Sequence, residues 1–460
     1  MNPLEYWIEK ERKTPILAEV DVLVAGGGPA GVSAAVGAAR TGASVLLIES
    51  NGFLGGMWTG GMVLTLAGYN SWLRPYNRCV RGVGGDWLGA ATALGGAEDN
   101  AGFVLNSDPA TMKLVADRLV LESGADLLLH TWVADVLTES NTVVGVIVEN
   151  VEGRFAIKAK VTIDCTGNGD LIARSGAAWH KGQALQPMTM PFRLTYDDSN
   201  EVDREAPATI PIGPEATVLG EPLLSEKSSR REPPGIDREA MRAAHARGEL
   251  PRFGGPWFGG IDGDVIWVNS TRIKGDASNI RDLTRAEVEG RQDVKALVDY
   301  FREHVPGFES AKLIDTSTVV GVRETRRLAG QYVITGDDIR SPSQYEDSIA
   351  VGCWPIDVHP SEGQVGIHEM YVPLPYPITY RSLLPTEVRG LLVAGRCIST
   401  TREALGSTRV GATCSAIGHG AGVAAAVAAQ EGTAVESVPM AEVHEELGRQ
   451  GGLFEPGQVG

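Results

Sequence analysis

Cysteine is scarce in this chain of 460 residues, which contains five, scattered and in no CxxC or CxxxxC arrangement. This scarcity excludes a disulfide framework, and the spacing supports neither a structural zinc site nor an active-site disulfide, so no metal is expected. We expect most of the cysteines to be buried as small apolar side chains. They are Cys79, Cys165, Cys353, Cys397 and Cys414.

Positive charge and aromatic side chains are also in short supply. Lys and Arg number 41 against 58 Asp and Glu, a net charge of −17, and no basic stripe with interleaved aromatics occurs, so no nucleic-acid partner is expected. Aromatic residues make up 6% of the chain, whereas glycines number 57. This composition favours an α/β protein with many close backbone turns, and the length favours two interleaved domains.

Continuous apolar segments are missing where a secretory or membrane protein would need them. Residues 1–20 contain Lys10, Arg12 and Lys13 among polar residues and have no apolar core. The longest run of small apolar residues, Val410 to Ala429, includes His419 and several glycines, which favours a core helix over a membrane span. We therefore expect a cytoplasmic protein without a membrane partner.

Near its start the chain has the pattern of a strand, a helix and a second strand. The apolar run Val22 to Ala25 predicts a strand buried on both faces of a parallel sheet. The small residues from Pro29 to Ala39 predict a helix that Gly42 ends. Val45 to Ile48 predicts the second buried strand.

Glycines between the first strand and the helix have the G-x-G-x-x-G spacing of a dinucleotide site. Gly26 allows a tight turn, Gly28 allows backbone to approach a pyrophosphate, and Gly31 allows the helix to pack closely. The N–H groups of the first helical turn then face the phosphate. Glu49, which ends the second strand, is placed to accept hydrogen bonds from a ribose and to repel a 2′-phosphate, so NADP is not expected in this site.

Several later segments are predicted to return to the same ligand. The glycine-dense loop Asn51 to Met62 is expected to lie against a large planar group, because its apolar side chains would be unfavourable in solvent. A helix over Asp108–Ser123 precedes a predicted meander. The meander strands are expected over Asp126–Val133, Val143–Glu149 and Phe155–Ile163. The turn Ile163–Asp170, IDCTGNGD, then makes another close approach at a strand end.

From Trp179 to about Tyr380 the pattern changes, which predicts an inserted second domain. It is expected to contain a loop over 197–234, helices over Arg238–Arg247 and Arg285–His304, and strands over Asp264–Ser270 and Thr316–Val322. The strand Leu391–Ala394 and a long helix of small residues from Thr408 return to the first domain. The predicted division is 1–178 and 386–460 for the nucleotide domain and 179–385 for the substrate domain.

Taken together, these motifs resemble the FAD-dependent oxidoreductases. The likeness runs nearly from end to end, and more narrowly it is to the bacterial family whose nucleotide domain is of the glutathione-reductase or succinate-dehydrogenase type. It implies an α/β fold with a Rossmann-like parallel sheet for FAD, an inserted β-meander and a second, α+β substrate domain. The motifs that carry it are GGGPAG with Glu49, GFLGGMWTGG, IDCTGNGD, GVRETRR, PIDVH, YRSLLP and LLVAGRCIS with the closing helix.

The resemblance implies that FAD is the cofactor and that its contacts come from both ends of the chain. Because hydride transfer leaves negative charge on the ring, a helix dipole at the start of the last long helix would stabilise the reduced flavin. Many related proteins hold the ribityl chain with an acid where this chain has Arg396, so Asp170 is the candidate for that role. The implied contacts are Gly26, Gly28, Pro29, Ala30, Gly31, Glu49, Ser50, Gly55, Gly56, Met57, Thr59, Gly60, Gly61, Val133, Thr166, Gly167, Asp170, Gly395, Arg396, Gly406, Arg409, Gly411 and Ala412.

Candidates for the chemistry lie in the second domain and at its return. Arg323, in a cluster with two further arginines, is a candidate to clamp a carboxylate or another anion, with a surface ion-pair cluster as the alternative. His359 is the candidate base, oriented by Asp357, with His368 as a lesser candidate. Tyr380 and Arg381 precede the return to the nucleotide domain and are expected either to bind substrate or to brace the junction.

The leading hypothesis is a FAD-dependent dehydrogenase or oxidase that takes a hydride from a small polar substrate, an alcohol, an amine or a C–C bond, to flavin N5. A flavin monooxygenase is the alternative among enzymes. A dinucleotide-binding module without catalysis is the alternative of another class. A homodimer is a further expectation from the class alone.

Overall fold

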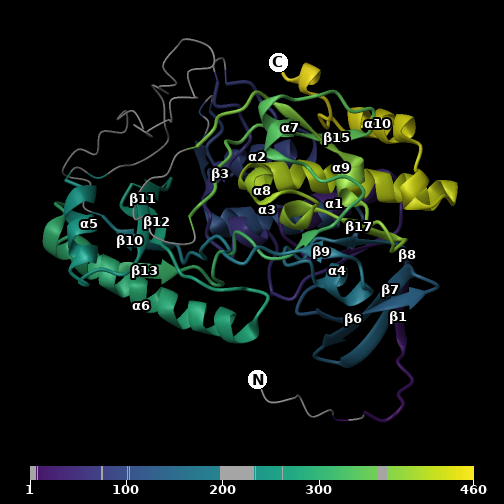
Figure 1. Cartoon of the computed structure of the whole chain (residues 1–460), viewed down its shortest axis with the longest axis horizontal. Coiled ribbons are helices and arrows are strands. Elements are labelled where there is room, and N and C mark those ends of the chain that lie inside the picture. Colours follow the sequence, from purple (N-terminus) through teal and green to yellow (C-terminus); the bar gives the residue numbers. More distant parts are fainter. Residues whose placement is uncertain are drawn as a thin grey trace.

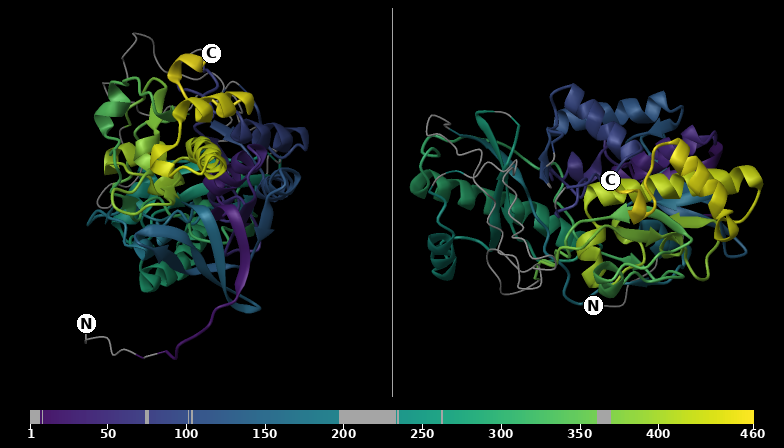
Figure 2. Two further views of the ribbon diagram at one scale, coloured as in Figure 1. Left: turned by 90° about the vertical axis from the view of Figure 1, so that its right-hand side faces the viewer. Right: turned by 90° about the horizontal axis from the view of Figure 1, so that it is seen from above.

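The computed structural model describes residues 7, 9–73, 76–100, 102, 104–196, 233, 235–261, 263–360 and 370–460. Two lobes lie side by side in it (Figure 1, Figure 2). Both ends of the chain build the first lobe, and the middle of the chain, drawn in teal, builds the second. The predicted loop over 197–234 lies outside the described residues except for Pro233, and so does His368.

A seven-stranded sheet organises the first lobe. Its order is β5-β2-β1-β8-β7-β6, with β17 also paired to β8. Strands β5, β2, β1, β8 and β17 run parallel, whereas β6, β7 and β8 form an antiparallel meander. The predicted Rossmann-like parallel sheet with an inserted β-meander is therefore confirmed. The strands are β1 Ile16–Ala25, β2 Val45–Ile48, β5 Asp126–Leu128, β6 Trp132–Glu139, β7 Thr142–Asn150, β8 Gly153–Asp164 and β17 Leu391–Val393.

The first strand predicted for the meander was wrong in its extent. The run 126–133 is broken, because the backbone of His130 takes a φ of 50° and turns the chain between β5 and β6. Strand β5 pairs with β2 at the far edge of the parallel sheet. The break also brings Thr131 beside the end of β2, where its N–H donates to the carbonyl of Glu49 at 2.9 Å.

Alternation along β1 sends successive side chains into two different cores. Val22 and Val24 pack with helices α1 (Pro29–Arg40) and α9 (Gly411–Glu431) on one face of the sheet. Leu23 and Ala25 pack on the other face with residues of the meander and of helix α4 (Asp170–Ser175). All four side chains are fully buried, as the continuous apolar run predicts for a parallel strand.

Helices α1 and α9 pack closely because glycine leaves no side chain between them. A Cβ on Gly418 would stand 2.0 Å from the carbonyl oxygen of Ala30, and one on Gly422 would stand 2.1 Å from that of Ala34. By length and composition α9 would suffice to cross a membrane, but 94% of its apolar window is buried inside the protein. The run is therefore a core helix.

Shorter elements complete the first lobe. Helix α3 begins where predicted, since the side chain of Asp108 caps it by accepting from the N–H of Thr111. All five cysteines are buried thiols. The remaining elements are α2 Val83–Ala93, α3 Pro109–Glu122, α7 Gly336–Arg340, α8 Arg402–Thr408, α10 Met440–Arg449, β3 Thr65–Ala67, β4 Val104–Asn106, β9 Trp179–His180, β14 Arg327–Leu328, β15 Ser348–Gly352 and β16 Tyr376–Thr379, with short 3-10 turns at Gly56–Trp58, Tyr380–Leu383, Gly395–Cys397, Val435–Ser437 and Pro456–Gln458.

The second lobe is an antiparallel sheet of order β11-β12-β10-β13 with its own apolar core. Its elements are β10 Phe192–Thr195, α5 Arg238–Ala246, β11 Phe253–Gly259, β12 Val265–Thr271, α6 Ile280–His304 and β13 Leu313–Thr316. Helix α6 starts earlier than predicted, because Asn279 caps it. The strand predicted over Thr316–Val322 was wrong. Beyond Thr316 the backbone instead bonds to the glycine loop of the first lobe, where the N–H of Val319 donates to the carbonyl of Gly60 at 3.1 Å.

Candidate functional site

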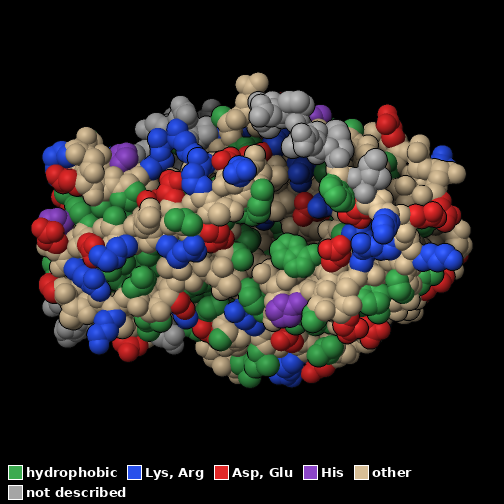
Figure 3. Space-filling view, turned by 90° about the horizontal axis from the view of Figure 1, so that it is seen from below, with side chains coloured by type: hydrophobic (Ala, Val, Ile, Leu, Met, Phe, Trp, Pro, Cys, Tyr) green, Lys and Arg blue, Asp and Glu red, His purple; other side chains and the backbone are tan. Residues whose placement is uncertain are grey.

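A cavity of about 580 Å³ is lined by residues of both lobes. Seen from below, the molecule is hollowed near its middle, with apolar side chains around the hollow (Figure 3). Sixteen of the predicted FAD contacts line the cavity, together with Arg323 and His359. Those sixteen are Gly26, Gly28, Pro29, Ala30, Glu49, Ser50, Gly56, Met57, Val133, Thr166, Gly167, Asp170, Gly395, Arg396, Arg409 and Gly411.

The turn between β1 and α1 exposes backbone to this cavity. Gly26 has a φ of 100°, and a Cβ there would stand 2.5 Å from the carbonyl oxygen of Cys165. At Gly28 an added Cβ would meet only the Cα of Gly56, at 3.9 Å. No side chain caps the start of α1. Its first N–H groups therefore face the cavity, which is the environment that an anionic phosphate requires.

Glu49 lies at one end of the cavity and is almost fully buried. Its carboxylate accepts the N–H of Gly27 at 2.7 Å and the N–H of Asn51 at 2.7 Å. These bonds join the end of β2 to the glycine turn. Ser50, Asn51 and Val133 line the cavity as well.

A turn at the end of β8 forms another wall. The buried carboxylate of Asp164 holds this turn by accepting the N–H groups of Thr166, Leu171 and Ile172 at 2.9–3.0 Å. Arg396 donates to the side-chain oxygen of Asn168 at 2.8 Å, and its Nε is buried without a partner among the described residues. Burial lowers the pKa of the Arg396 guanidinium from its ordinary value.

The start of α9 lies at the cavity as well. Gly411 lines the cavity next to Val410, and no side chain caps this helix. A Cβ on Gly411 would stand 2.1 Å from the indole nitrogen of Trp58. Two long helices thus direct their positive ends at one cavity.

Seven predicted contacts do not line the cavity and lie behind its wall. At Gly31 a Cβ would come 1.7 Å from the carbonyl oxygen of Gly26, so this glycine serves helix packing. The hydroxyl of Thr59 donates to the carbonyl of Leu54 at 2.7 Å and holds the glycine loop together. At Gly406 a Cβ would stand 2.9 Å from the backbone nitrogen of Asp357. The seven are Gly31, Gly55, Thr59, Gly60, Gly61, Gly406 and Ala412.

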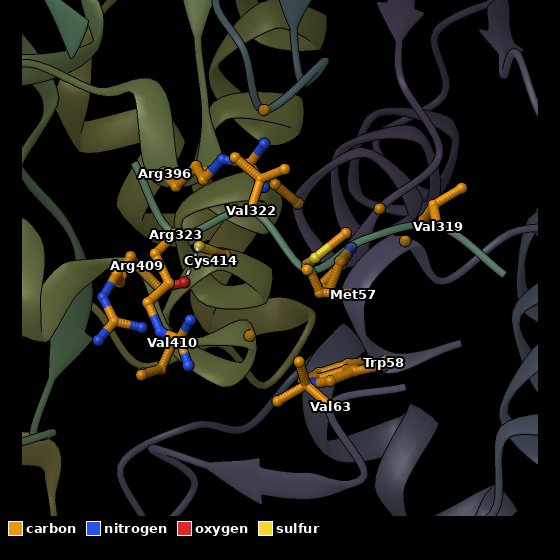
Figure 4. Close-up of a pocket in the computed structure, with 18 of the residues that line it drawn as sticks. Met57, Trp58, Val63, Val319, Val322, Arg323, Arg396, Arg409, Val410 and Cys414 are labelled. Atoms are coloured by element: carbon orange, nitrogen blue, oxygen red, sulfur yellow. Dashed lines mark hydrogen bonds between the residues drawn. The ribbon is translucent and has the colours of Figure 1, made fainter. Parts of the chain in front are cut away.

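Arginines, an acid and a histidine meet at the end of the cavity bordered by the second lobe. Arg409 donates to the carboxylate of Asp357 at 3.1 Å, and the same carboxylate lies 3.4 Å from Nε2 of His359. Arg323 donates to the carbonyl of Pro187 at 2.7 Å and to the hydroxyl of Thr189. Figure 4 shows Arg323 and Arg409 on the same side of the cavity, across from Met57 and Trp58.

Burial controls the charges in this group. It lowers the pKa of His359 well below its ordinary value, against the attraction of Asp357, and the charge of Arg323 lowers it further. The imidazole is therefore neutral at neutral pH. Burial also lowers the pKa of Arg323, and the neighbouring guanidinium groups of Arg272 and Arg409 add to that effect.

Tyr380 and Arg381 do not line the cavity, and of the two roles expected for them their contacts favour bracing the junction. The hydroxyl of Tyr380 is buried and donates to the carbonyl of Val435 at 2.8 Å. Arg381 pairs with Asp347 at 2.9 Å and lies over the ring of Tyr332. Both side chains brace the packing of the first lobe.

Sequence reasoning missed much of the wall that the second lobe supplies. Trp267 and Asn269 line the cavity from β12. Arg272 follows this strand, does not line the cavity, and donates to the side-chain oxygen of Asn269 at 3.3 Å. A tryptophan and an asparagine two residues apart on a strand share a face, so alternation in this run was the available signal. The other missed residues with aromatic side chains are Trp72, Trp132, Trp257, Phe258 and Trp354, whereas Phe53 and Trp58 belong to the loop that was predicted to face the ligand.

A family model described as FAD dependent oxidoreductase matches residues 21–447 of this chain. The thiamine thiazole synthases of Aeropyrum pernix and Methanococcus aeolicus are 30% and 32% identical to it over 166 and 164 residues. Each match covers 34% of this chain and 57% of the relative, so it spans little more than half the length of those relatives. The digeranylgeranylglycerophospholipid reductase of Methanocella arvoryzae is 26% identical over 164 residues, which cover 34% of this chain and 41% of that protein.

Two solved structures have a similar fold over 94% of this chain. One is a geranylgeranyl bacteriochlorophyll reductase-like protein from Thermoplasma acidophilum, with 14% identity, 83% of its own chain covered and a TM-score of 0.45. The other is the flavin-dependent brominase Bmp2, with 15% identity, 85% of its own chain covered and a TM-score of 0.48. At these identities the likeness is one of fold alone.

Proposed function

The chain belongs to the family of FAD-dependent oxidoreductases, and from this premise we propose that it takes a hydride from a small polar substrate inside the cavity between its lobes. The hydride comes from a C–H bond of an alcohol or an amine, or from a saturated C–C pair. One observation carries the proposal: the glycine turn with Glu49 and the group of Arg323, Arg409 and His359 border a single cavity. A dinucleotide bound at the first set of residues would share this cavity with the second set.

The residues present fit FAD. Around Gly28 the space beyond the backbone is open, and the uncapped start of α1 supplies N–H donors for a pyrophosphate. Glu49 would supply the acceptor for a ribose, and Val133 lines the same cavity. Gly56, Met57, Arg396 and Gly411 would surround the ring end. Thr166, Gly167 and Asp170 would face the linking chain.

FAD supplies the acceptor for the hydride, at N5 of its ring system. The chain's own task is to orient the substrate and to remove the proton that leaves with the hydride. His359 is the proposed base, because burial keeps its imidazole neutral. Nε2 of His359 lies 3.4 Å from the carboxylate of Asp357, and this contact favours one orientation of the ring. Asp357, which also binds Arg409, positions the imidazole.

The first experiment is an absorption spectrum of the purified protein before and after heat or acid precipitation, with mass spectrometry of the supernatant. Released FAD is the expected result. Anaerobic bleaching of the bound flavin by a panel of alcohols, amines and acids then tests the hydride transfer. A colourless protein that does not take up added FAD would overturn the proposal.

The finer features of the assignment also belong to this proposal. The parallel sheet with its meander supports a nucleotide domain of the glutathione-reductase or succinate-dehydrogenase type. A cytoplasmic location, a small-molecule substrate and a homodimer are further proposals. Fractionation of the source cells and the mass of the protein in solution would test the first and the last.

A further inference from the structure

We propose that the substrate is an organic carboxylate with an apolar body, and that Arg323 and Arg409 bind its carboxylate. This inference rests on the function proposed above and names the class of its substrate. It follows from an excess of buried positive charge at one end of the cavity and from the apolar surface beside that charge.

The excess of charge can be counted from the contacts. Arg272, Arg323 and Arg409 interact with one another electrostatically, and Asp357 is the acid that acts on them. Arg323 bonds to a carbonyl and a hydroxyl, and Arg272 bonds to backbone carbonyls, a hydroxyl and an amide oxygen. Within the part of the chain that the structure describes, neither of these two arginines has a carboxylate within ion-pair distance.

Such an arrangement is costly without an anion. A guanidinium stays protonated in proteins, so the lowered pKa values of Arg272 and Arg323 reflect the free energy of holding these charges together out of water. An anion between Arg323 and Arg409 would offset that cost. The planar guanidinium, with its paired N–H donors, matches the two oxygens of a carboxylate.

The neighbouring surface is apolar and aromatic. Trp72 and Trp354 pack edge to face with their ring centroids 5.2 Å apart, in a cluster that includes Val410, the neighbour of Arg409. Trp257 and Phe258 face the cavity from β11. An anion bound here therefore carries an apolar or aromatic body. Of the three arginines, Arg323 and Arg409 line the cavity, and Asp357 pairs with Arg409. These two arginines and one carboxylate leave a single positive charge at the proposed site, which a singly charged group neutralises.

The test uses the FAD-bound protein and three probes of similar shape: benzoate, neutral benzamide and the dianion phenylphosphonate. Binding is followed by the change in the flavin absorption spectrum and by calorimetry. We expect benzoate to bind at least about 10-fold more tightly than the other two probes, as a charge-assisted contact predicts. The same titrations are repeated with Arg323→Met and with Arg193→Met. The second variant is the matched control, because Arg193 lies in the same lobe and pairs with Asp315 at 2.6 Å.

Arg323→Met should weaken the binding of benzoate roughly 10- to 100-fold and leave the affinity for benzamide unchanged. Arg193→Met should change neither affinity. Equal binding of benzoate and benzamide by the wild-type protein would overturn the proposal without any variant. Tighter binding of phenylphosphonate would overturn the choice of a carboxylate. If the protein does not hold FAD, the proposed function fails, and calorimetry with the same probes still decides whether the arginines form an anion site.

Discussion

Replacing Gly28 with valine should remove FAD without unfolding the protein. The backbone of Gly28 has a φ of −74°, which any residue adopts, and an added Cβ meets only the Cα of Gly56 at 3.9 Å. The cost to folding is therefore that of a poorer helix N-cap, about 0.5–1 kcal/mol. The valine side chain instead fills the space next to the first N–H groups of α1, where the pyrophosphate is proposed to bind.

The loss of affinity follows from the contacts that valine prevents. Each of two N–H hydrogen bonds to a charged phosphate contributes about 1.5–3 kcal/mol to binding, so their loss lowers the affinity for FAD by roughly 10²- to 10⁴-fold. The assay is the flavin absorbance per protein, followed by titration of the cofactor-free variant with FAD. Thermal unfolding of the cofactor-free proteins checks the fold.

Two matched glycines make this result interpretable. Gly89→Val adds the same side chain where nothing lies within 4 Å, and it should retain FAD. Gly31→Ala should fail to fold, since its Cβ would stand 1.7 Å from the carbonyl oxygen of Gly26. A Gly28→Val protein that purifies fully yellow with the affinity of the wild type would refute the assignment of the phosphate site.

Three further predictions concern the base, a buried histidine and the packing of α1 on α9. His359→Ala should slow anaerobic flavin reduction by roughly 10²- to 10⁴-fold while FAD stays bound, and unchanged stopped-flow kinetics would remove His359 from the mechanism. Burial lowers the pKa of His419 from 6.5 to about 4. The unfolded chain takes up this proton at a higher pH than the folded protein does, so stability should fall as the pH drops below about 6.5. Between pH 7.5 and pH 5, His419→Gln should lose about 2 kcal/mol less of its unfolding free energy in urea than the wild type does. An equal pH dependence of the two proteins would contradict this expectation. Gly422→Val should cost about 3 kcal/mol or more in a thermal melt, because its Cβ would come 2.1 Å from the carbonyl oxygen of Ala34. Gly448→Ala, where no described atom lies within 4 Å, should instead raise stability by about 0.5–1 kcal/mol, because alanine favours a helix over glycine.

Local elements near the ends of the chain were predictable because short-range physics determines them. The apolar run at Val22 to Ala25, the glycines of the following turn and the cap at Asp108 each act over a few residues. The predicted order of strand, helix and strand agrees with β1, α1 and β2. The class of the sheet followed from that order, since parallel neighbours require a crossover helix.

Predictions failed where a distant contact decides the conformation. Residues beyond Thr316 have the β-branched composition of a strand, yet Val319 bonds to Gly60 and Gly321 pairs with Thr189, so the backbone lies along the cavity. The break after β5 depends in the same way on Thr131 and Glu49. No pattern in the local sequence contains these partners.

The sequence by itself predicted the part of the cavity wall that the glycine turn and Glu49 form, because these residues lie within one strand-helix-strand unit. Tertiary structure alone decided where the charged groups meet. Arg323 and Arg409 come from two separate segments, and only folding brings their charges together beside Asp357 at the cavity. For Tyr380 and Arg381 the sequence suggested a role in the site, because they precede the return of the chain to the first domain. Tertiary contacts instead hold both side chains away from the cavity, Tyr380 against the carbonyl of Val435 and Arg381 against Asp347. A site shared by two lobes depends on contacts between residues far apart in the chain, which sequence spacing does not encode.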